Sequence, residues 1–268
     1  MLSSVLLADS PEFSVAAVRC GGHRSGWSAT EAAARHEIVL VRSGRFRLRR
    51  DGREAVVDPT RGYVQVPGDE ASFAHPAGGD VCTAISLSTG FWRAVTDDAG
   101  PSARPAVPVD GRLDLAHRRL LRSTSDVAFA MAEELVGLLT EVLRRAADAG
   151  TVRPHRAVRG PGLADQAREA ILADHPDAAG LVTLARLLGV SPSHLSRVFH
   201  RETGLTLTRY RNRVRAGRAL DRIEQGAHNL AEVAADLGFA DQAHLARTVK
   251  AEFGRTSTEI RRLLGAVR

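Results

Sequence analysis

The sequence predicts an α+β protein of two domains, a β-rich N-terminal domain followed by an all-helical C-terminal domain. Up to about residue 90, apolar and polar residues alternate in short segments, the period of half-buried strands. After residue 124 the apolar residues recur every three or four positions, the period of amphipathic helices. Residues 151–162 are rich in glycine, proline and arginine, as linkers are. We therefore expect domains at 1–150 and 163–268, joined by a linker at 151–162.

The N-terminal strands follow from alternation and turn residues. Apolar residues fill 38–41, and Phe46 and Leu48 then alternate with arginines. Asp51 and Gly52 form a dipeptide typical of tight hairpins. Further strands are expected at 63–66 and 81–87. Short strands with this spacing and Gly/Pro punctuation predict a small barrel or sandwich.

A helix is predicted over 126–147. Apolar residues recur there with helical spacing on a single stripe, at Val127, Met131, Leu135, Leu138 and Val142. Two roles are open for this stripe: a dimer interface, or a surface covered by the barrel of the same chain.

Positive charge is concentrated in the C-terminal part. Residues 1–150 hold 18 Arg and 19 Asp+Glu, a net charge of −1, whereas residues 151–268 hold 19 Arg+Lys and 12 Asp+Glu, a net charge of +7. A basic module beside a near-neutral one suits a polyanionic partner, because neutralised phosphates release counterions. Basic domains without nucleic-acid partners are also common, so charge alone does not decide.

The sequence shows no sign of secretion or membrane insertion. Two cysteines, Cys20 and Cys82, are too few for a disulfide framework. The first 13 residues lack the basic start of a signal peptide, and no run of 18 apolar residues is present. We expect a cytoplasmic chain without membrane contact.

The C-terminal part contains a degenerate repeat. In each copy a short helical segment leads through a glycine, Gly189 or Gly238, into a second helical segment. Glycine fits a turn of positive φ. Ser191 and Asp241 are suited to cap the second helix of each copy, with Pro192 as the first helical residue in the first copy. Each copy therefore predicts a helix-turn-helix unit, and two such copies in the basic half are a far more specific signal than one.

These residues resemble the DNA-binding domain of the AraC/XylS family of transcription regulators. The resemblance covers about residues 165–264 and rests on the following matches: Leu195-Ser196-Arg197-Val198-Phe199, Glu202-Thr203-Gly204, Arg215 with Ala219, Ala234 with Leu237-Gly238-Phe239 and Asp241-Gln242, His244-Leu245 with Arg247, and Phe253-Gly254. It implies seven helices, with a long linker helix at about 207–225 that holds two recognition helices over successive major grooves, about 34 Å apart.

Two departures from the family pattern stand out. The proline that follows each closing glycine in the family is replaced by Thr206-Leu207-Thr208 and Thr256-Ser257-Thr258. The second recognition helix carries Leu245, Thr248 and Val249 where the family prefers bulky aromatics. These departures concern the packing of the second unit rather than the fold.

The resemblance assigns DNA contacts residue by residue. On the first recognition helix it assigns Ser193, Ser196 and Arg197 to base edges, and His200 and Arg201 nearer to phosphate; on the second it assigns Gln242, His244, Ala246 and Arg247 to bases, and Lys250 to the backbone. Arginine matches guanine and glutamine matches adenine in the major groove. The alternative for Arg197 and Arg247 is an ion pair within the domain, and for His244 it is packing against the preceding helix.

The N-terminal half resembles the cupin-like sensor domain that often precedes this DNA-binding domain. The matching text is residues 36–44 and 62–68, leading to His75. Such domains bind effectors, dimerise, or both. The effector-binding candidates are Trp27, His36, Phe73 and His75. The His-x-His pair of metal-dependent cupin enzymes is absent, so no catalytic residue and no cofactor is expected.

A metal or redox site is a weaker hypothesis for the same domain. Cys20, His75 and Cys82 have ligand types that suit zinc. Their spacing matches no compact motif, and a free cysteine is often a small buried hydrophobe.

The sequence as a whole predicts a ligand-responsive, sequence-specific regulator of transcription that is not an enzyme. Its expected partners are double-stranded promoter DNA, a small-molecule effector, a second copy in a homodimer and, if it acts as an activator, RNA polymerase. Two alternatives stay open: a constitutive DNA-binding protein whose N-terminal domain only dimerises, and a cupin enzyme with a helical tail.

Overall fold

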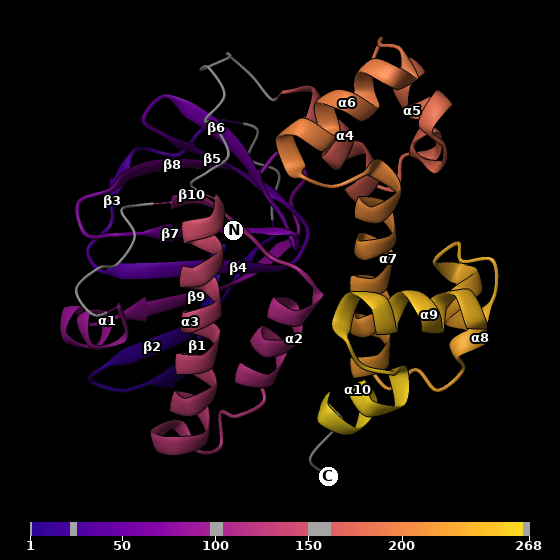
Figure 1. The fold of residues 1–268 in the computed structure, drawn as a ribbon. Coiled ribbons are helices and arrows are strands. Elements are labelled where there is room, and N and C mark those ends of the chain that lie inside the picture. The colour runs from indigo at the N-terminus through magenta and orange to yellow at the C-terminus, as the bar shows by residue number, and fades with distance from the viewer. Residues whose placement is uncertain (1, 22–25, 97–103, 150–161, 265–268) are drawn as a thin grey trace.

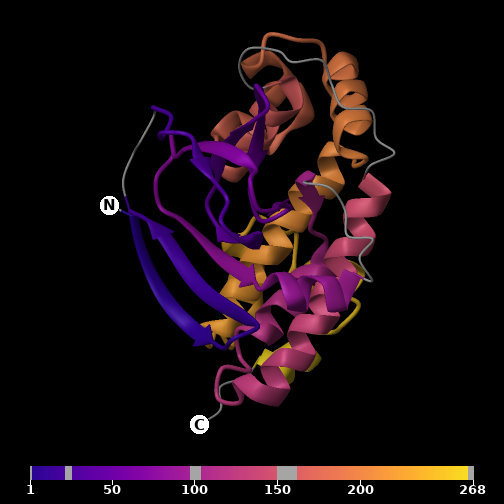
Figure 2. The same ribbon diagram turned by 90° about the vertical axis from the view of Figure 1, so that its left-hand side faces the viewer.

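The computed structural model describes residues 2–21, 26–96, 104–149 and 162–264. The β-rich N-terminal part and the helical C-terminal part lie side by side, and a long helix, α7 (Leu207–Glu224), runs along their boundary (Figures 1 and 2). The predicted linker at 151–162 lies, apart from Gly162, outside the described residues.

Two antiparallel sheets form the N-terminal domain, as the alternation predicted. The six-stranded sheet has the order β1 (Leu2–Asp9), β2 (Phe13–Cys20), β9 (Asp80–Leu87), β4 (His36–Ser43), β7 (Arg61–Gln65) and β10 (Arg104–Pro108); the four-stranded sheet has the order β3 (Glu31–Ala32), β8 (Glu70–Ala74), β5 (Phe46–Arg50) and β6 (Arg53–Val57). The expected hairpin is confirmed: Phe46 pairs with Val57, and Asp51 and Gly52 both have positive φ, as a primed turn requires. Strand β1, at the edge of the larger sheet, was not predicted.

Helices cover one face of the larger sheet. They are α1 (Thr89–Thr96), α2 (Gly111–Leu120) and α3 (Ala132–Ala149), the last preceded by a π-helical turn at Val127–Met131. The apolar stripe of α3, including Leu135, Leu138 and Val142, is completely buried in one core with sheet residues such as Ile38 and Ile85. Burial of each such side chain stabilises the fold by about 1.5–3 kcal/mol. Of the two roles left open for this stripe, the structure shows coverage by the same chain.

Seven α-helices make up the described part of the C-terminal domain: α4 (Leu163–Leu172), α5 (Leu181–Leu187), α6 (Pro192–Thr203), α7, α8 (Leu230–Asp236), α9 (Gln242–Phe253) and α10 (Ser257–Leu264). A short 3-10 turn lies at Pro176–Ala179. Helices α4–α6 pack on one end of α7, and α8–α10 pack on the other end (Figure 1). Their two apolar cores are separate, and α7 contributes to both.

No helix among the residues described here has the length and apolar character needed to cross a membrane.

Candidate nucleic-acid interface

The first helix-turn-helix unit consists of α5 and α6. Gly189 in the connecting turn has a φ of 67°, a conformation that favours glycine. The Ser191 side chain caps α6 by accepting a hydrogen bond from the backbone N–H of His194, and Pro192 opens the helix. Leu195, Val198 and Phe199 are buried on the inner face of α6. These features agree with the sequence prediction.

The second unit, α8 and α9, repeats this geometry. Gly238 has a φ of 68°, and the Asp241 carboxylate accepts a hydrogen bond from the backbone N–H of His244 at 2.6 Å. Leu245, Thr248 and Val249 are buried. The smaller side chains at these positions are therefore part of an intact core, and Thr248 satisfies its hydroxyl by donating to the carbonyl of His244.

Threonine takes over the role of the missing family prolines. Thr206 caps α7 by accepting a hydrogen bond from the backbone N–H of Arg209. Thr256 accepts a hydrogen bond from the backbone N–H of Glu259, whose carboxylate accepts hydrogen bonds from the Thr256 hydroxyl and N–H. This is a reciprocal capping box. Each helix start is stabilised by a side chain rather than by the fixed φ of proline.

Helix α7 sets the distance between the two units. Its 18 residues span about 27 Å at the normal rise of an α-helix. Arginines on α7 bond to groups on both sides of it: Arg218 donates to the carbonyl of Leu172 of α4 at 2.8 Å, and Arg215 donates to the carbonyl of Gly238 in the turn of the second unit at 2.8 Å. The spacer helix is therefore hydrogen-bonded to the second unit and to α4, which packs on α6 of the first unit.

Nearly all of the predicted DNA-contacting side chains lie on the exposed faces of α6 and α9. The exposed residues are Ser193, Ser196, Arg197, His200 and Arg201 on α6, and Gln242, Ala246, Arg247 and Lys250 on α9. Neither Arg197 nor Arg247 forms an ion pair with any residue that the structure describes. Arg197 donates only to the carbonyl of Ser193, one turn earlier. The intradomain ion pair considered for these two arginines is therefore not found within the described residues.

His244 is placed differently from its neighbours. It is half-buried, and its ring meets Phe239 edge-to-face with the ring centroids 5.3 Å apart. Its Nδ1 also accepts a hydrogen bond from the N–H of Ala240. This is the packing alternative considered for His244, and it leaves only the exposed edge of the ring free for other contacts.

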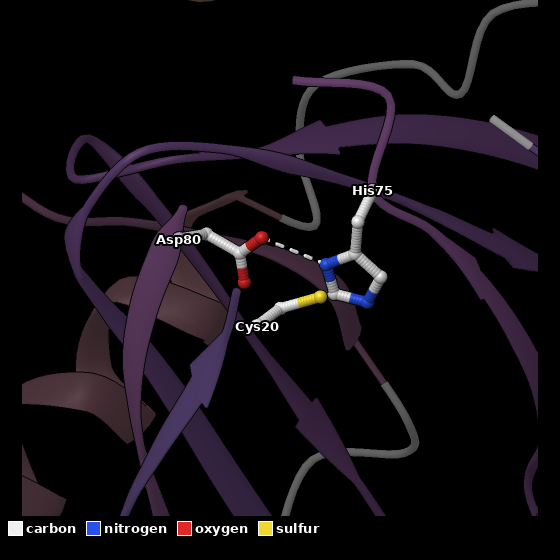
Figure 3. Close-up of side chains that lie close together, drawn as sticks. All are labelled: Cys20, His75 and Asp80. Carbon is white, nitrogen blue, oxygen red and sulfur yellow. Dashed lines mark hydrogen bonds and ion pairs between the residues drawn. The ribbon is translucent and has the colours of Figure 1, made fainter. Parts of the chain in front are cut away.

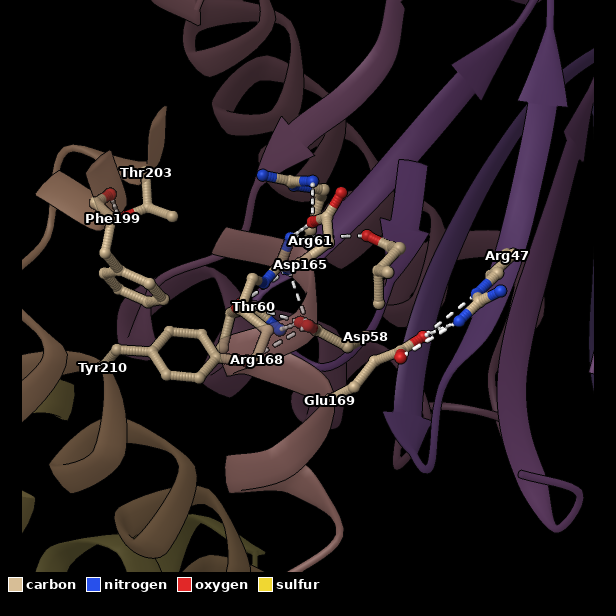
Figure 4. Close-up of polar contacts among 11 residues, drawn as sticks. Arg47, Asp58, Thr60, Arg61, Asp165, Arg168, Glu169, Phe199, Thr203 and Tyr210 are labelled. Atoms are coloured by element: carbon tan, nitrogen blue, oxygen red, sulfur yellow. Dashed lines mark hydrogen bonds and ion pairs between the residues drawn. The ribbon is translucent and has the colours of Figure 1, made fainter. Parts of the chain in front are cut away.

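A buried ion cluster attaches the first unit to the β-domain (Figure 4). Arg168 of α4 is 1% exposed and pairs at 2.6 Å with the fully buried carboxylate of Asp58. The same carboxylate accepts a hydrogen bond from the Tyr210 hydroxyl of α7 at 3.1 Å, and from Thr60. Although burial lowers the pKa of Arg168, attraction to Asp58 raises it overall, so the guanidinium stays charged.

Two further ion pairs surround this cluster. Arg47 of β5 holds Glu169 through a bidentate pair with distances near 3 Å, and Arg61 of β7 lies 3.3 Å from Asp165. Because planar, bidentate pairs fix orientation, α4 is held in one position on the sheet.

The second unit is attached through helix α2. Leu115 of α2 is buried in the core of the second unit, next to residues of α8, α9 and α10. The fit is close at Gly111, where an added Cβ would lie 2.3 Å from the carbonyl oxygen of Glu252 in α9. Arg118, on the same helix, is buried and pairs with Asp221 of α7 at 2.8 Å. The last turn of α9 is thus part of an interdomain contact.

A cavity of about 460 Å³ lies in the N-terminal domain and contains three of the four effector candidates. Trp27, Phe73 and His75 line it, together with Tyr63, Gln65 and Glu37. The fourth candidate, His36, lies outside the cavity: its ring stacks on Trp92 at 4.6 Å, among the helices on the other face of β4. The reason is strand alternation, since His36 and Glu37 point to opposite faces.

The cysteines also line this cavity, and they form no disulfide with each other. Burial, and then the charge of Asp80, raise the pKa of Cys82 to about 12, so its thiol stays protonated. Cys20 and His75 come together, but the third group close to both is Asp80 and not Cys82. Asp80 was missed in the sequence; the available signal was its position two residues before Cys82 on an alternating strand.

Comparison with known proteins points to the same part of the chain. Residues 184–263 match the family model described as a helix-turn-helix domain. A curated relative, the HTH-type transcriptional regulator GlxA of Rhizobium meliloti (strain 1021), is 31% identical over 161 residues, which is 53% of this chain and 47% of the relative. The chain thus spans about half the length of that relative.

Two solved structures are similar at a greater distance. ToxT from Vibrio cholerae O395 is 10% identical, with 96% of this chain and all of that chain covered, at a TM-score of 0.40. An AraC-type DNA-binding domain protein from Chromobacterium violaceum is 22% identical, with 40% of this chain and 95% of that chain covered, at a TM-score of 0.36.

The family match over residues 184–263 concerns the same part of the chain as the two units on one long helix, with their caps and turns. The C-terminal part of the chain therefore carries a helix-turn-helix domain, in agreement with the resemblance to the AraC/XylS family that its sequence shows, and about half of the chain is similar to an HTH-type transcriptional regulator.

Proposed function

We propose that this protein is a sequence-specific, DNA-binding regulator of transcription whose activity is controlled by a small molecule bound in its N-terminal domain. The observation that carries the proposal is the pair of exposed recognition helices, α6 and α9, at the two ends of α7. A spacer of this size suits helices that enter successive major grooves, which lie about 34 Å apart on one face of DNA.

The exposed residues favour base contacts from both helices. Arg197 and Arg247 are exposed without an ionic partner among the described residues, and Gln242 stands at the start of α9. Arginine and glutamine have the hydrogen-bonding geometry for guanine and adenine. Arg201 and Lys250 lie one turn further along their helices, where we expect phosphate contacts.

Effector control is supported by two strands that reach both the cavity and the helical domain. In β7, Tyr63 and Gln65 line the cavity, while Arg61 pairs with Asp165 of α4. In β4, Glu37 lines the cavity, and Arg42 pairs with Glu224 of α7 at 2.8 Å. Each strand runs directly from the cavity to one of these ion pairs. A ligand that shifts either strand would therefore act on the contacts that hold α4 and α7.

Homodimerisation is the third part of the proposal. Because the inner stripe of α3 is used within the chain, the candidate surface is formed by the outer face of α3, where Val136 is 42% exposed, and by the preceding π-helical turn, where Phe129 is 76% exposed. Exposed apolar side chains of this size that lie close together are typical of interfaces. RNA polymerase would be a further partner if the protein activates transcription.

The DNA-binding proposal is tested with the full-length chain. Fragments selected from genomic DNA are expected to share a motif with two half-sites, one helical turn apart, that resists competition by random duplex. Arg197→Ala should weaken binding to this motif, whereas Arg144→Ala, which removes an exposed arginine of α3, should not. Binding that random duplex competes away equally would refute sequence-specific recognition.

A thermal-shift screen against a panel of metabolites separates the regulated protein from a constitutive one. A ligand that binds only the folded state raises the melting temperature. The shift should be lost in Phe73→Ala and retained in His36→Ala, since only Phe73 lines the cavity. A ligand that stabilises the protein without changing its DNA affinity would favour the constitutive alternative. Turnover of that ligand would favour the enzyme alternative.

A further inference from the structure

We infer that Cys20, His75 and Asp80 form a zinc-binding site at the wall of the N-terminal cavity. Figure 3 shows the three side chains converging from separate segments of the sheet domain. This inference goes beyond the proposed function, because it holds whether or not the protein binds DNA.

The three groups are close enough to share one ion. Their potential ligand atoms all lie within 4.8 Å of one another, and the His75 Nδ1 lies 2.8 Å from an Asp80 carboxylate oxygen. Zinc bonds of about 2.0–2.3 Å place tetrahedral ligands about 3–4 Å apart. Small side-chain rotations therefore suffice to seat the ion.

The backbone around the site is fixed in advance. Cys20 ends β2 and Asp80 begins β9, and the two residues are direct partners in the antiparallel register. The turn that carries the chain from His75 to Asp80 contains two glycines of positive φ, and the N–H of Gly79 donates to the carbonyl of Cys20 at 2.8 Å. The turn after β4 also packs closely, since a Cβ on Gly44 would lie 2.7 Å from the Asp80 Cα. A site with its backbone held in this way loses little entropy when a metal binds.

The donor set selects the metal. Thiolate, imidazole and carboxylate together suit zinc, whereas calcium and magnesium prefer oxygen ligands alone. Asp80 is 1% exposed and Cys20 is 4% exposed. A buried carboxylate is unfavourable unless a positive charge compensates it, and a bound cation meets this need.

The cavity leaves room for a fourth ligand. All three residues line the 460 Å³ cavity, whose wall also includes Phe46 and Phe73. Zinc sites with three protein ligands keep an open position for water or a small molecule. The ion would therefore face whatever molecule enters the cavity, and a ligand with a carboxylate, thiol or imidazole group would be favoured.

The test is a zinc titration of the purified full-length protein, in competition with a chromophoric chelator. We expect one zinc per chain. Cys20→Ser and His75→Ala each remove a ligand, so each should weaken binding by more than the roughly 10- to 100-fold that loss of an outer-shell partner costs. Cys82→Ser is the matched control: it changes the other cavity-lining thiol and should leave the affinity unchanged.

Cobalt provides a second readout that a purely structural His75–Asp80 pair would not produce. The cobalt-loaded protein should show a thiolate-to-metal charge-transfer band that is absent in Cys20→Ser and present in Cys82→Ser. If Cys20→Ser does not fold, Asp80→Asn, which keeps the size of the side chain, tests the same affinity. The inference is overturned if the wild-type protein binds no stoichiometric zinc, if Cys82→Ser weakens binding as much as Cys20→Ser does, or if the band persists in Cys20→Ser.

Discussion

The two helix-turn-helix units share their local geometry but are attached to the rest of the protein by different physical means. Gly189 and Gly238 have nearly the same φ, and Ser191 and Asp241 cap equivalent helices. The first unit is held through α4 chiefly by buried charges, whereas α9 of the second unit is held by apolar packing on α2, beside the buried ion pair between Arg118 of α2 and Asp221 of α7.

Under the proposed regulation, this difference decides which recognition helix a movement of the N-terminal domain would reach first. No residue of α6 takes part in the ion cluster around Arg168, so the first recognition helix stays open while the unit is held. The last turn of α9 lies against Gly111 of α2. A change in the position of α2 would therefore reach the second recognition helix directly and the first only through α7.

The largest effect is expected at the ion cluster. Arg168→Met removes the guanidinium and leaves the Asp58 carboxylate buried without its cation, which should cost about 3–5 kcal/mol of unfolding free energy in a urea titration. Arg47→Ala, which breaks the more exposed pair with Glu169, should cost about 1 kcal/mol or less. Equal losses in the two variants would show that the first unit is not held by buried charge.

The apolar attachment of the second unit gives the next largest effect. Leu115→Ala should cost about 2–5 kcal/mol, because it leaves a cavity in the core that α2 shares with α8–α10. Hydrogen exchange should accelerate at amides of α8–α10 and stay unchanged in α5 and α6. The control is Leu2→Ala, which truncates a leucine that is 65% exposed. Uniform acceleration in both units would contradict separate attachment.

DNA binding compares the two recognition helices directly. Arg197→Ala should weaken binding to the selected motif by about 1–3 kcal/mol and relax one base preference, since the proposed bidentate contact to guanine would be lost. Arg247→Ala should weaken binding by a similar amount and relax a base preference one helical turn of DNA away. Arg201→Ala should weaken binding to all sequences alike, as expected for a phosphate contact. An unchanged motif in Arg247→Ala would mean that the second unit does not read bases.

The smallest effect is a pH dependence at α2. His117 is buried against Thr83, and burial, followed by the charges of Arg42 and Arg118, lowers its pKa well below its ordinary value of 6.5. As the pH falls through about 6.5, His117 becomes protonated in the unfolded chain but stays neutral in the folded protein. The contribution of His117 to the free energy of unfolding is therefore complete above about pH 6.5, and it decreases at lower pH by at most about 1.4 kcal/mol per pH unit.

His117→Gln keeps a hydrogen-bonding group at this position and removes the titration. Urea titrations at pH 7.5 and pH 5.5 should differ less in this variant than in the wild type. His228→Gln, which changes an exposed histidine, should preserve the wild-type difference. If His117→Gln kept the full wild-type difference in unfolding free energy between pH 7.5 and pH 5.5, other groups would be responsible for the acid sensitivity.

Much of the functional domain could be predicted from local sequence. Turn glycines, capping residues and helical periodicity act within a few residues, so Gly189, Ser191 and Asp241 were identified without knowledge of the fold. The outward face of α6 followed from the same periodicity, whereas that of α9 was assigned by the family resemblance. His36 shows the limit of this approach, because its ring lies on the face of β4 opposite to the cavity. The match to a family pattern did not specify which face of the strand each residue occupies.

The sequence by itself determined two helix-turn-helix units and a β-rich partner domain, because turn chemistry and hydrophobic period depend on neighbouring residues. The long spacer helix was expected from the family resemblance. Only the tertiary structure decided which distant residues meet. Arg168 and Asp58 lie 110 positions apart, and Cys20 and Asp80 face each other across two strands. Such contacts depend on strand register and domain packing, and these are set by the burial of many apolar side chains at once rather than by any short segment.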